Sequence, residues 1–372
     1  MDWNWQSPDW PNFTWDPARL AAQEQAFLLH AGLTIGSTQH LGDEERDRLL
    51  VERMSGEALT TSRIEGELLD RDSVQSSIQR QLGLKADRRR IPPAERGIAE
   101  MMVALYRSYS EPLSATMLFG WHRMLAEGRR DLSDIGRYRT SAEPMQIVSG
   151  PAGSPRVHYE APPSARVPAE MARLIEWFNR TAPGEPDALP ALTRAGLAHL
   201  RFELIHPFED GNGRLGRSLA EKALAQAANR PLLTGLASAI LAHQKRYYEA
   251  LERADRTLDA SGWLDWFART ALDAQQSSLR QVEFLLAKTR LLDRLCDQLN
   301  PRQRKALLRM FEAGPQGFEG GMSAGKYSTV TGASPATTTR DLAELVDRGA
   351  LARRGARKYA RYSLKRYSLK LD

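Results

Sequence analysis

The sequence predicts a mainly α-helical protein that contains one β-hairpin and ends in a small α+β module. Leu-rich amphipathic stretches with few glycines cover most of residues 17–300, and this pattern is typical of helices. Residues 136–163 interrupt it, because short β-prone pieces there flank a run of turn residues. Residues 301–372 carry a net charge of +9, whereas the rest of the chain carries −3. This charge indicates a separate module with an anionic partner, or simply solvated side chains near a terminus.

The composition excludes several classes of protein. Of the 372 residues, 42% are hydrophobic and 26% are charged, which argues against intrinsic disorder. The length allows about two to three domains. No apolar run approaches the ~20 residues of a membrane span, and the N-terminus lacks the basic start of a secretion signal. Cys296 is the only cysteine and cannot form an internal disulfide, so we expect a cytoplasmic protein without a membrane partner.

The elements are predicted in chain order from these patterns. Residues 1–20 hold four tryptophans, which we expect to clamp an extended arm onto a core; binding of a partner, or homodimerisation, is the alternative. Helices are predicted over 17–86, from a basic turn near 85–93 toward residue 109, and over 114–129. A hairpin with strands at 145–148 and 156–159 follows. Helical periodicity returns at 168–182, 189–205, 213–229, 237–257 and 261–297.

The most informative segment runs from His206 to Arg217, with the sequence HPFEDGNGRLGR. A helix must end at His206, because Pro207 disfavours α geometry in the preceding residue. The next helix carries Arg214 and Arg217 on one face of its first turn, where cations oppose the helix dipole. Two guanidinium groups, flexible glycines and free N–H donors at a helix start predict a polyphosphate site.

Two side chains near this helix start suggest chemistry. Asp210 supplies a hard oxygen ligand, suited to the Mg²⁺ that accompanies a nucleotide. His206 lies at the negative end of its own helix and is a candidate general base for an incoming hydroxyl group.

Three other patterns compete for the same kinds of residue. Gly211–Gly216 matches the dinucleotide-binding fingerprint, but it follows a helix rather than a strand. His199, Glu203 and His206 fall on one helical face, as a metal triad would, although His206 lies at the helix end beside proline. Gly320–Lys326 resembles a P-loop, but tyrosine follows the lysine where Ser or Thr must hold magnesium, so a P-loop is excluded. The first two patterns remain as alternatives.

Glu65 lies at an unusual place for a carboxylate. Val51, Met54, Ala58 and Thr61 precede it at helical spacing on the same, mostly apolar face. A carboxylate there must find a cation or take up a proton. It pairs either with an arginine of the structural core or with an arginine meant for phosphate.

These residues resemble the Fic family. His206–Arg217 is similar to the Fic motif HPFx(D/E)GNGRxxR, without departure at any fixed position. The hairpin at 136–163 resembles the family's flap, which aligns the target segment. Thr61–Gly66 resembles the (S/T)xxxE(G/N) inhibitory motif of those Fic proteins whose inhibitory helix precedes the core. The resemblance covers about residues 45–270 and implies a Fic-type helical bundle with a β-hairpin flap.

The resemblance also implies a domain organisation. Residues 1–90 would form an N-terminal helical region with the Trp-rich arm and an inhibitory helix at about 45–66. Residues 91–275 would form the Fic catalytic core, and residues 276–372 a linker helix with the C-terminal module.

The function implied by the resemblance is that of a protein adenylyltransferase, which moves AMP from ATP to a Ser, Thr or Tyr hydroxyl of a target protein. His206 would deprotonate the hydroxyl, Asp210 would hold Mg²⁺, and Glu65 would inhibit by pairing with Arg217. The opposite activity, removal of AMP with water activated by Glu65, is an alternative. The residues implied to bind ATP are Asp210, Gly211, Asn212, Gly213, Arg214, Leu215, Gly216, Arg217, Tyr247 and Tyr248.

The C-terminal module is predicted to be a winged helix. Helices are expected at 302–313 and 323–330, and a third begins with Ser334 as N-cap and Pro335 in its first turn. Thr337–Arg340 are expected to face outward, and 351–364 to form a basic β-hairpin. A recognition helix with a basic wing predicts DNA binding through residues 334–361; contact with another protein is the alternative, since many winged helices only mediate protein contacts. The second hypothesis for function is therefore a transcriptional regulator with a nucleotide-sensing core.

Overall fold

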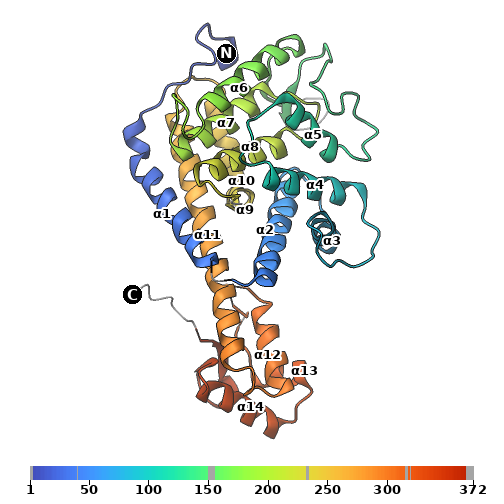
Figure 1. Cartoon of the computed structure of the whole chain (residues 1–372), viewed down its shortest axis with the longest axis vertical. Coiled ribbons are helices and arrows are strands. Elements are labelled where there is room, and N and C mark those ends of the chain that lie inside the picture. The colour runs from blue at the N-terminus through green and yellow to red at the C-terminus, as the bar shows by residue number, and fades with distance from the viewer. Residues whose placement is uncertain are drawn as a thin grey trace. The chain divides into compact units, whose positions relative to one another are not determined.

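The computed structural model describes residues 3–39, 41–149, 156–231, 234–314, 317–318 and 320–365. The chain forms two compact units, Met1–Ile35 with Gly42–Ser277 and Gly36–Leu41 with Ser278–Asp372. Each unit has its own cluster of buried apolar side chains. The mainly α-helical class predicted from the sequence is confirmed, with two small antiparallel hairpins (Figure 1).

The helices of the larger unit follow the predicted order, with boundaries shifted by a few residues. They are α1 (Ala21–Thr38), α2 (Asp43–Ile64), α3 (Arg71–Gln81), α4 (Pro93–Arg107), α5 (Ala115–Leu125), α6 (Val167–Arg180), α7 (Ala191–Ile205), α8 (Asn212–Ala227), α9 (Leu236–Ala242), α10 (Gln244–Ala254) and α11 (Ser261–Arg294). The last turn of α1 and the second half of α11 belong to the smaller unit. Short 3₁₀ helices lie at Asn4–Gln6, Pro17–Leu20 and Ser164–Arg166.

Helix α7 is the centre of the larger unit. Every one of its residues is buried, as expected of a helix enclosed on all sides. It packs against α6 and α8, and α2 in turn contacts α3, α4, α8 and α9 (Figure 1). Because α7 ends just before the predicted loop and α8 begins just after it, the core of the unit holds both ends of that loop.

The Trp-rich arm is clamped to the larger unit, as its aromatic content predicts. Trp5 and Trp10 are buried. The indole N–H of Trp5 donates to the Glu160 carbonyl at 2.7 Å, and that of Trp10 donates to Glu170 Oε2 at 2.9 Å. Each indole therefore fills an apolar site and satisfies its own polar atom.

The predicted hairpin consists of β1 (Gln146–Ser149) and β2 (Arg156–Glu160). They pair antiparallel, from Gln146 opposite Glu160 to Ser149 opposite Arg156, with a register shift between Ile147 and Val148. The connection at 150–155 lies outside the described residues. Tyr159 is buried, and its hydroxyl donates to the Leu204 carbonyl of α7 at 2.5 Å, so the base of the hairpin is fixed to the central helix.

One helix prediction in this unit is wrong. The stretch 237–257 is two helices, α9 and α10, because His243 leaves helical geometry at φ −131°. The break lets both helices contact α2. The Ala237 amide of α9 donates to Glu57 Oε1 at 2.8 Å, and the Gln244 side chain donates to the Ile64 carbonyl at 3.1 Å.

The smaller unit has the expected order of helices followed by a hairpin. Its elements are α12 (Pro301–Phe311), α13 (Ala324–Thr331), α14 (Pro335–Asp347), β3 (Leu351–Arg354), a 3₁₀ turn at Arg357–Tyr359 and β4 (Arg361–Leu364). Ser334 caps α14 by accepting a hydrogen bond from the Thr337 amide at 3.3 Å. The prediction that Thr338 faces outward is wrong: it is buried, because it lies four residues before Leu342 and seven before Leu345 on the apolar face.

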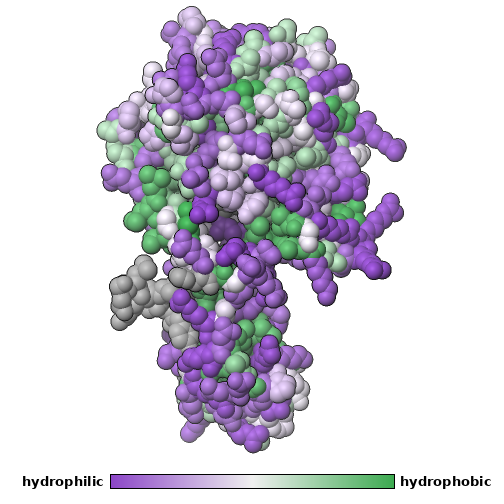
Figure 2. Space-filling view, viewed as in Figure 1, coloured by the Kyte–Doolittle hydropathy of each residue, from purple (hydrophilic) through white to green (hydrophobic). Residues whose placement is uncertain are grey.

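The described surface is mixed in polarity. On the face drawn in Figure 2, hydrophobic residues are interspersed with hydrophilic ones. Among the residues that the structure describes, no helix has the length and apolar character to cross a membrane.

Candidate active site

His206 ends α7 in a left-handed backbone conformation, with φ 49° and ψ 61°. Non-glycine residues adopt this region at an energetic cost, which the surroundings must offset. Arg139, itself buried, does so: its Nε donates to the His206 carbonyl at 2.8 Å, and its amide donates to the Pro207 carbonyl at 2.9 Å. The predicted end of the helix at His206 is confirmed.

The protonation state of His206 suits a general base. Burial lowers its pKa to about 4, and the nearby Arg139 guanidinium acts in the same direction, so the imidazole is neutral near pH 7. Its Nδ1 lies 3.2 Å from the Glu203 carbonyl. With Nδ1–H donating there, the lone pair of Nε2 is left to accept a proton.

The loop between α7 and α8 is closed by its own side chains. The Phe208 amide donates to Asn212 Oδ1 at 3.0 Å, and Asn212 Nδ2 donates to the Phe208 carbonyl at 2.8 Å. Asn212 is buried, so its side chain holds the loop rather than reaching out to a phosphate. Gly211 has φ 81°, which glycine adopts without strain.

Helix α8 begins at Asn212, one residue earlier than predicted. The amides of its first turn therefore belong to Asn212, Gly213 and Arg214, and no intrahelical acceptor exists for such groups. A Cβ atom on Gly213 would lie 2.2 Å from Glu65 Oε1, and one on Gly216 would lie 2.4 Å from Glu203 Oε1. Both glycines therefore allow a carboxylate to approach the α8 backbone closely.

The two arginines of α8 point toward the segment that follows α2. Arg217 is buried; its NH2 donates to Glu65 Oε1 at 2.7 Å and its Nε donates to Thr61 Oγ1 at 2.7 Å. Arg214 is also buried, and its NH1 donates to Glu67 Oε2 at 2.5 Å. Each cation thus holds a carboxylate from the same short stretch of chain.

Glu65 lies at the C-cap of α2 rather than within the helix, and its side chain is 31% exposed. The apolar stripe before it is confirmed, since Val51, Met54 and Ala58 are buried. Burial alone lowers the pKa of Arg217, but the Glu65 carboxylate outweighs this and the pKa is raised. The guanidinium is therefore charged in the pair.

Asp210 accepts hydrogen bonds from an arginine side chain and from a backbone amide. Arg129 NH1 donates to its Oδ2 at 2.6 Å, and the Gly211 amide donates to its Oδ1 at 2.6 Å. Partial burial raises the pKa of Asp210, but Arg129 and Arg214 outweigh this and the pKa lies below its ordinary value. The ionised carboxylate is 40% exposed, so an incoming cation could reach it.

The remaining predicted binding residues lie deeper. Leu215 is fully buried in the core. Tyr247 is also buried, and its hydroxyl shares a hydrogen bond of 3.0 Å with His199 Nε2, so its ring is closed off from a nucleotide base. Tyr248 is 47% exposed and is the member of the pair with free ring surface.

The metal-triad alternative is not supported by the geometry. His199 is buried and stacks on Trp263 with ring centroids 5.6 Å apart. Burial lowers its pKa to about 3 and raises that of the buried Glu203 to about 8. Within the described residues, no group of three or more His, Cys, Asp or Glu side chains could hold a metal ion.

Two family profiles match the chain. A profile of the Fic/DOC family matches residues 112–224, which include the whole loop, and a domain of unknown function (DUF4172) matches residues 3–84. The solved structure of a Fic family protein from Desulfovibrio desulfuricans G20 is similar in fold, with a TM-score of 0.52 at 22% identity. That match covers 97% of this chain and 99% of the other.

The chain contains a Fic domain. Fic-1 of C. elegans also shares the fold, with a TM-score of 0.50 and 21% identity over 72% of this chain and 73% of that one. Among curated relatives, protein adenylyltransferase Fic of Drosophila melanogaster is 29% identical over 164 residues. A probable protein adenylyltransferase of Aquifex aeolicus is 28% identical over 97 residues. The matches span 40% and 26% of this chain, and only 31% and 27% of those relatives.

Sequence reasoning missed four residues around the Fic loop. Glu67 pairs with Arg214, Arg129 with Asp210, and Arg139 with the His206 carbonyl. His122 is buried, stacks on Phe208 with ring centroids 4.2 Å apart, and accepts a hydrogen bond from the Gly136 amide at 2.9 Å. Glu67 stands two residues after Glu65, so its position could have suggested a role; the other three act across long sequence separations that no local pattern records.

Proposed function

We propose that this Fic protein transfers AMP from ATP to a hydroxyl side chain of a protein, and that the segment around Glu65 keeps it inactive. The observation that carries the proposal is the arrangement around the Fic loop. A neutral His206 lies at one end, and at the other two buried arginines hold carboxylates that polyphosphate oxygens could replace. The names of the insect and bacterial relatives support the same activity.

The chemical step follows from these groups. The target hydroxyl donates its proton to His206 Nε2 while its oxygen forms a bond to the α-phosphorus of ATP. The bond from that phosphorus to the bridging oxygen breaks, and pyrophosphate leaves with the electron pair. Arg214 and Arg217 would bind the departing phosphates, and the free amides of the first turn of α8 would face the chain of phosphates.

The residues present fit a magnesium ion that arrives with the nucleotide. Mg²⁺ in nucleotide sites is held by one or two carboxylates together with substrate phosphates, and Asp210 offers one ionised, partly exposed carboxylate. The ion would neutralise developing charge on the phosphates. Arg129 competes for the same oxygen, so it would have to release it.

The proposed inhibition is a competition for guanidinium groups. Arg217 donates to both Thr61 and Glu65, and a guanidinium satisfied by a carboxylate cannot bind a phosphate equally well. Glu65 also fills the space next to Gly213, at the start of α8. Glu67 repeats the arrangement at Arg214. The segment therefore covers both cationic positions at once.

The test is incubation with ATP and Mg²⁺ followed by intact mass spectrometry. Glu65→Gly is expected to gain AMP on its own chain, wild type to gain little, and the double variant with His206→Ala to gain none. Equal labelling of wild type and Glu65→Gly would contradict the inhibitory role. Labelling of the double variant, which lacks His206, would contradict the role of His206 as the general base.

Removal of AMP is a second candidate, favoured by the position of Glu65. Its carboxylate is partly exposed and close enough to the loop to influence the pKa of His206, so it could activate a water molecule. Wild type would then release AMP from pre-labelled chains, whereas Glu65→Gln would not. Retention of the label by both would reject this activity.

DNA binding by the smaller unit is a further candidate, favoured by the arginines of its hairpin. Arg353, Arg354 and Arg357 are exposed, as are Thr339 and Arg340 near the start of α14. A filter-binding titration of the full chain against salt tests this, because phosphate contacts make log affinity fall with log salt. Absence of binding at ~50 mM salt would reject it.

A further inference from the structure

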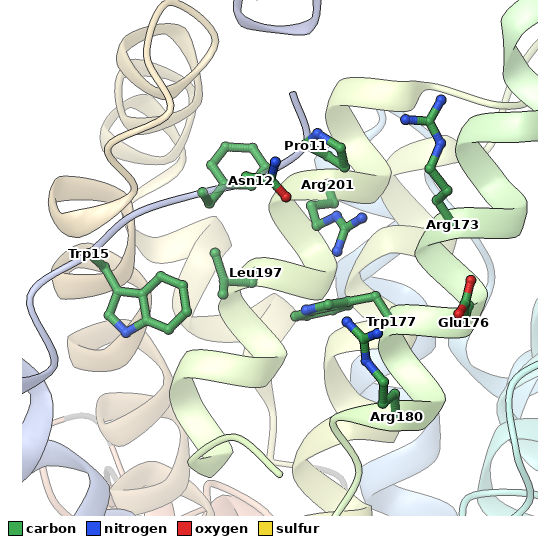
Figure 3. A pocket seen from close by; sticks show the side chains of 10 residues that line it. Pro11, Asn12, Trp15, Arg173, Glu176, Trp177, Arg180, Leu197 and Arg201 are labelled. Atoms are coloured by element: carbon green, nitrogen blue, oxygen red, sulfur yellow. The ribbon is translucent and has the colours of Figure 1, made fainter. Parts of the chain in front are cut away.

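A second pocket lies on a different part of the larger unit, between the Trp-rich arm and helices α6 and α7. Its volume is about 350 Å³, within the range of small-molecule sites. Figure 3 shows the side chains around it. Most of the residues that line the pocket are aromatic or cationic: Phe13, Trp15, Arg173, Trp177, Arg180 and Arg201.

Arg201 is the unusual member of this set. It is 5% exposed, and its guanidinium lies over the Trp177 ring, 4.7 Å from the ring centroid (Figure 3). Within the described part of the chain, its Nε has no hydrogen-bond partner and no carboxylate forms an ion pair with it. A buried charge without a partner is costly in a folded protein. The nearby Glu170 is held by Arg166 and Arg173, so a bound anion would give Arg201 the direct ion pair that Glu170 does not provide.

The other two arginines of the pocket, unlike Arg201, form ion pairs with carboxylates. Arg173 pairs with Glu170 at 3.4 Å and Arg180 pairs with Asp187 at 2.8 Å, and both side chains are about half exposed. Burial lowers the pKa of Arg201 to about 10. The buried Glu170 carboxylate opposes this effect, whereas Arg173 and Arg180 act in the same direction as burial. The guanidinium remains charged at neutral pH, so three cations surround one cavity, with Glu176 as the acid among the lining residues.

The residues that line the pocket indicate which kind of anion fits it. The indole rings of Trp15 and Trp177 lie on either side of Leu197 (Figure 3) and offer flat apolar surface suited to a planar ring. Asn12 supplies an amide to the lining that can pair with ring nitrogens or carbonyl groups. Three cations match a doubly charged phosphate better than a single carboxylate, and planar guanidinium groups bind phosphate well.

We propose that this pocket binds a mononucleotide, with its phosphate on Arg201 and its base against the tryptophan walls. The site lies between the region matched by the domain of unknown function and helices α6 and α7 of the Fic region. It is separate from the loop at His206 and does not depend on the activity proposed there.

The test measures binding of AMP to the full chain without Mg²⁺ by isothermal titration calorimetry. Arg201→Met, which keeps an unbranched side chain and removes the charge, is expected to weaken AMP binding about tenfold or more. Arg201→Lys is expected to retain part of the affinity, and the rim variant Arg173→Met most of it. Adenosine and inorganic phosphate, each with half of the ligand, are expected to bind at least about tenfold more weakly than AMP.

Arg217→Met separates this pocket from the Fic loop. AMP binding lost in Arg217→Met but retained in Arg201→Met would place all of the AMP at the loop and overturn the proposal. Absence of AMP binding to wild type at ~5 mM would overturn it too. The melting temperature without ligand is a control on folding: Arg201→Met is expected to match or exceed wild type, because it removes an unpaired buried charge. A marked loss of thermal stability would make Arg201 a structural residue and contradict the proposal.

Discussion

The larger unit holds buried arginines in two contrasting ways. At the start of α8, Arg214 and Arg217 each hold a carboxylate from the segment 65–67. In the pocket beside the arm, Arg201 stacks on an indole, its Nε has no hydrogen-bond partner, and no carboxylate of the described residues forms an ion pair with it. Both arrangements remove a guanidinium from water, which is costly unless the charge is compensated. The difference is that Glu65 and Glu67 pair directly with the arginines at the Fic loop, whereas Arg201 has no such ion pair among the described residues.

This contrast suggests what each site responds to. A ligand at the Fic loop must displace the carboxylates, so its apparent affinity is reduced by the stability of the inhibited state. A ligand in the arm pocket displaces only solvent and relieves an unpaired charge. Loss of the internal anion should therefore strengthen binding at the first site and leave the second unchanged.

The largest expected effect is on ATP binding in Glu65→Gln. Removal of the charge frees Arg217, and we expect ATP affinity, measured by titration calorimetry with the His206→Ala background, to rise about tenfold or more. Glu52→Gln on the exposed face of α2, where Glu52 pairs with Arg71, is the matched control and should leave affinity unchanged. Equal ATP affinities for the His206→Ala chain and for its Glu65→Gln and Glu52→Gln variants would show that Glu65 does not compete with phosphate.

A smaller effect is expected at the second carboxylate. Glu67 pairs with Arg214, and its side chain is 33% exposed, so solvent weakens the pair. In Glu67→Gln we expect ATP affinity to rise about three- to tenfold. The double variant with Glu65→Gln tests coupling, since both acids hold arginines of one helix turn. A double variant no tighter than Glu65→Gln alone would show that Glu67 has no separate inhibitory role.

Stability without nucleotide gives a third, smaller contrast. Glu65→Gln leaves the buried Arg217 without a carboxylate, with Thr61 and a neutral amide as its acceptors, and we expect the free energy of unfolding to fall by about 1–3 kcal/mol. Arg201→Met should show no such loss. Urea denaturation of both variants measures the difference. Equal losses would mean that the two arginines are structural in the same way.

The sequence allowed much of the Fic loop to be predicted, because its determinants are local. Pro207 ends α7 at His206, and Arg214 and Arg217 share a face through helical spacing. The glycines of the loop could also be located from the sequence. Their close approach to Glu65 and Glu203 could not be predicted from it. The pairing of Glu65 with Arg217 could be anticipated only through the family resemblance, since 152 residues separate the two.

The rest could not be predicted because it depends on tertiary contacts. Arg139 reads in the sequence as one more surface cation, yet it is buried and holds the backbone of His206. Arg201 occurs in an ordinary amphipathic stretch, and only the packing of the arm and α6 around it shows that it is buried. The division of 237–257 at His243 likewise follows from contacts of α9 and α10 with α2.

The smallest expected effect is that of pH on the activity of Glu65→Gly. The pKa of His206 is lowered to about 4 by burial, so the base is already neutral at pH 5.5 and further increases in pH add nothing. We expect the initial rate of AMP transfer at saturating ATP to be flat from about pH 5.5 to 7.5 and to fall only as the pH approaches 4.

The groups nearest to His206 that could distort this profile are Glu203, Asp210 and Arg139. Of these, Glu203, with a pKa of about 8, titrates only at the alkaline end. A rate that rises about fivefold between pH 5.5 and 6.5 would show that His206 has an ordinary pKa. Its burial at the end of α7 would then not be what prepares it as a base.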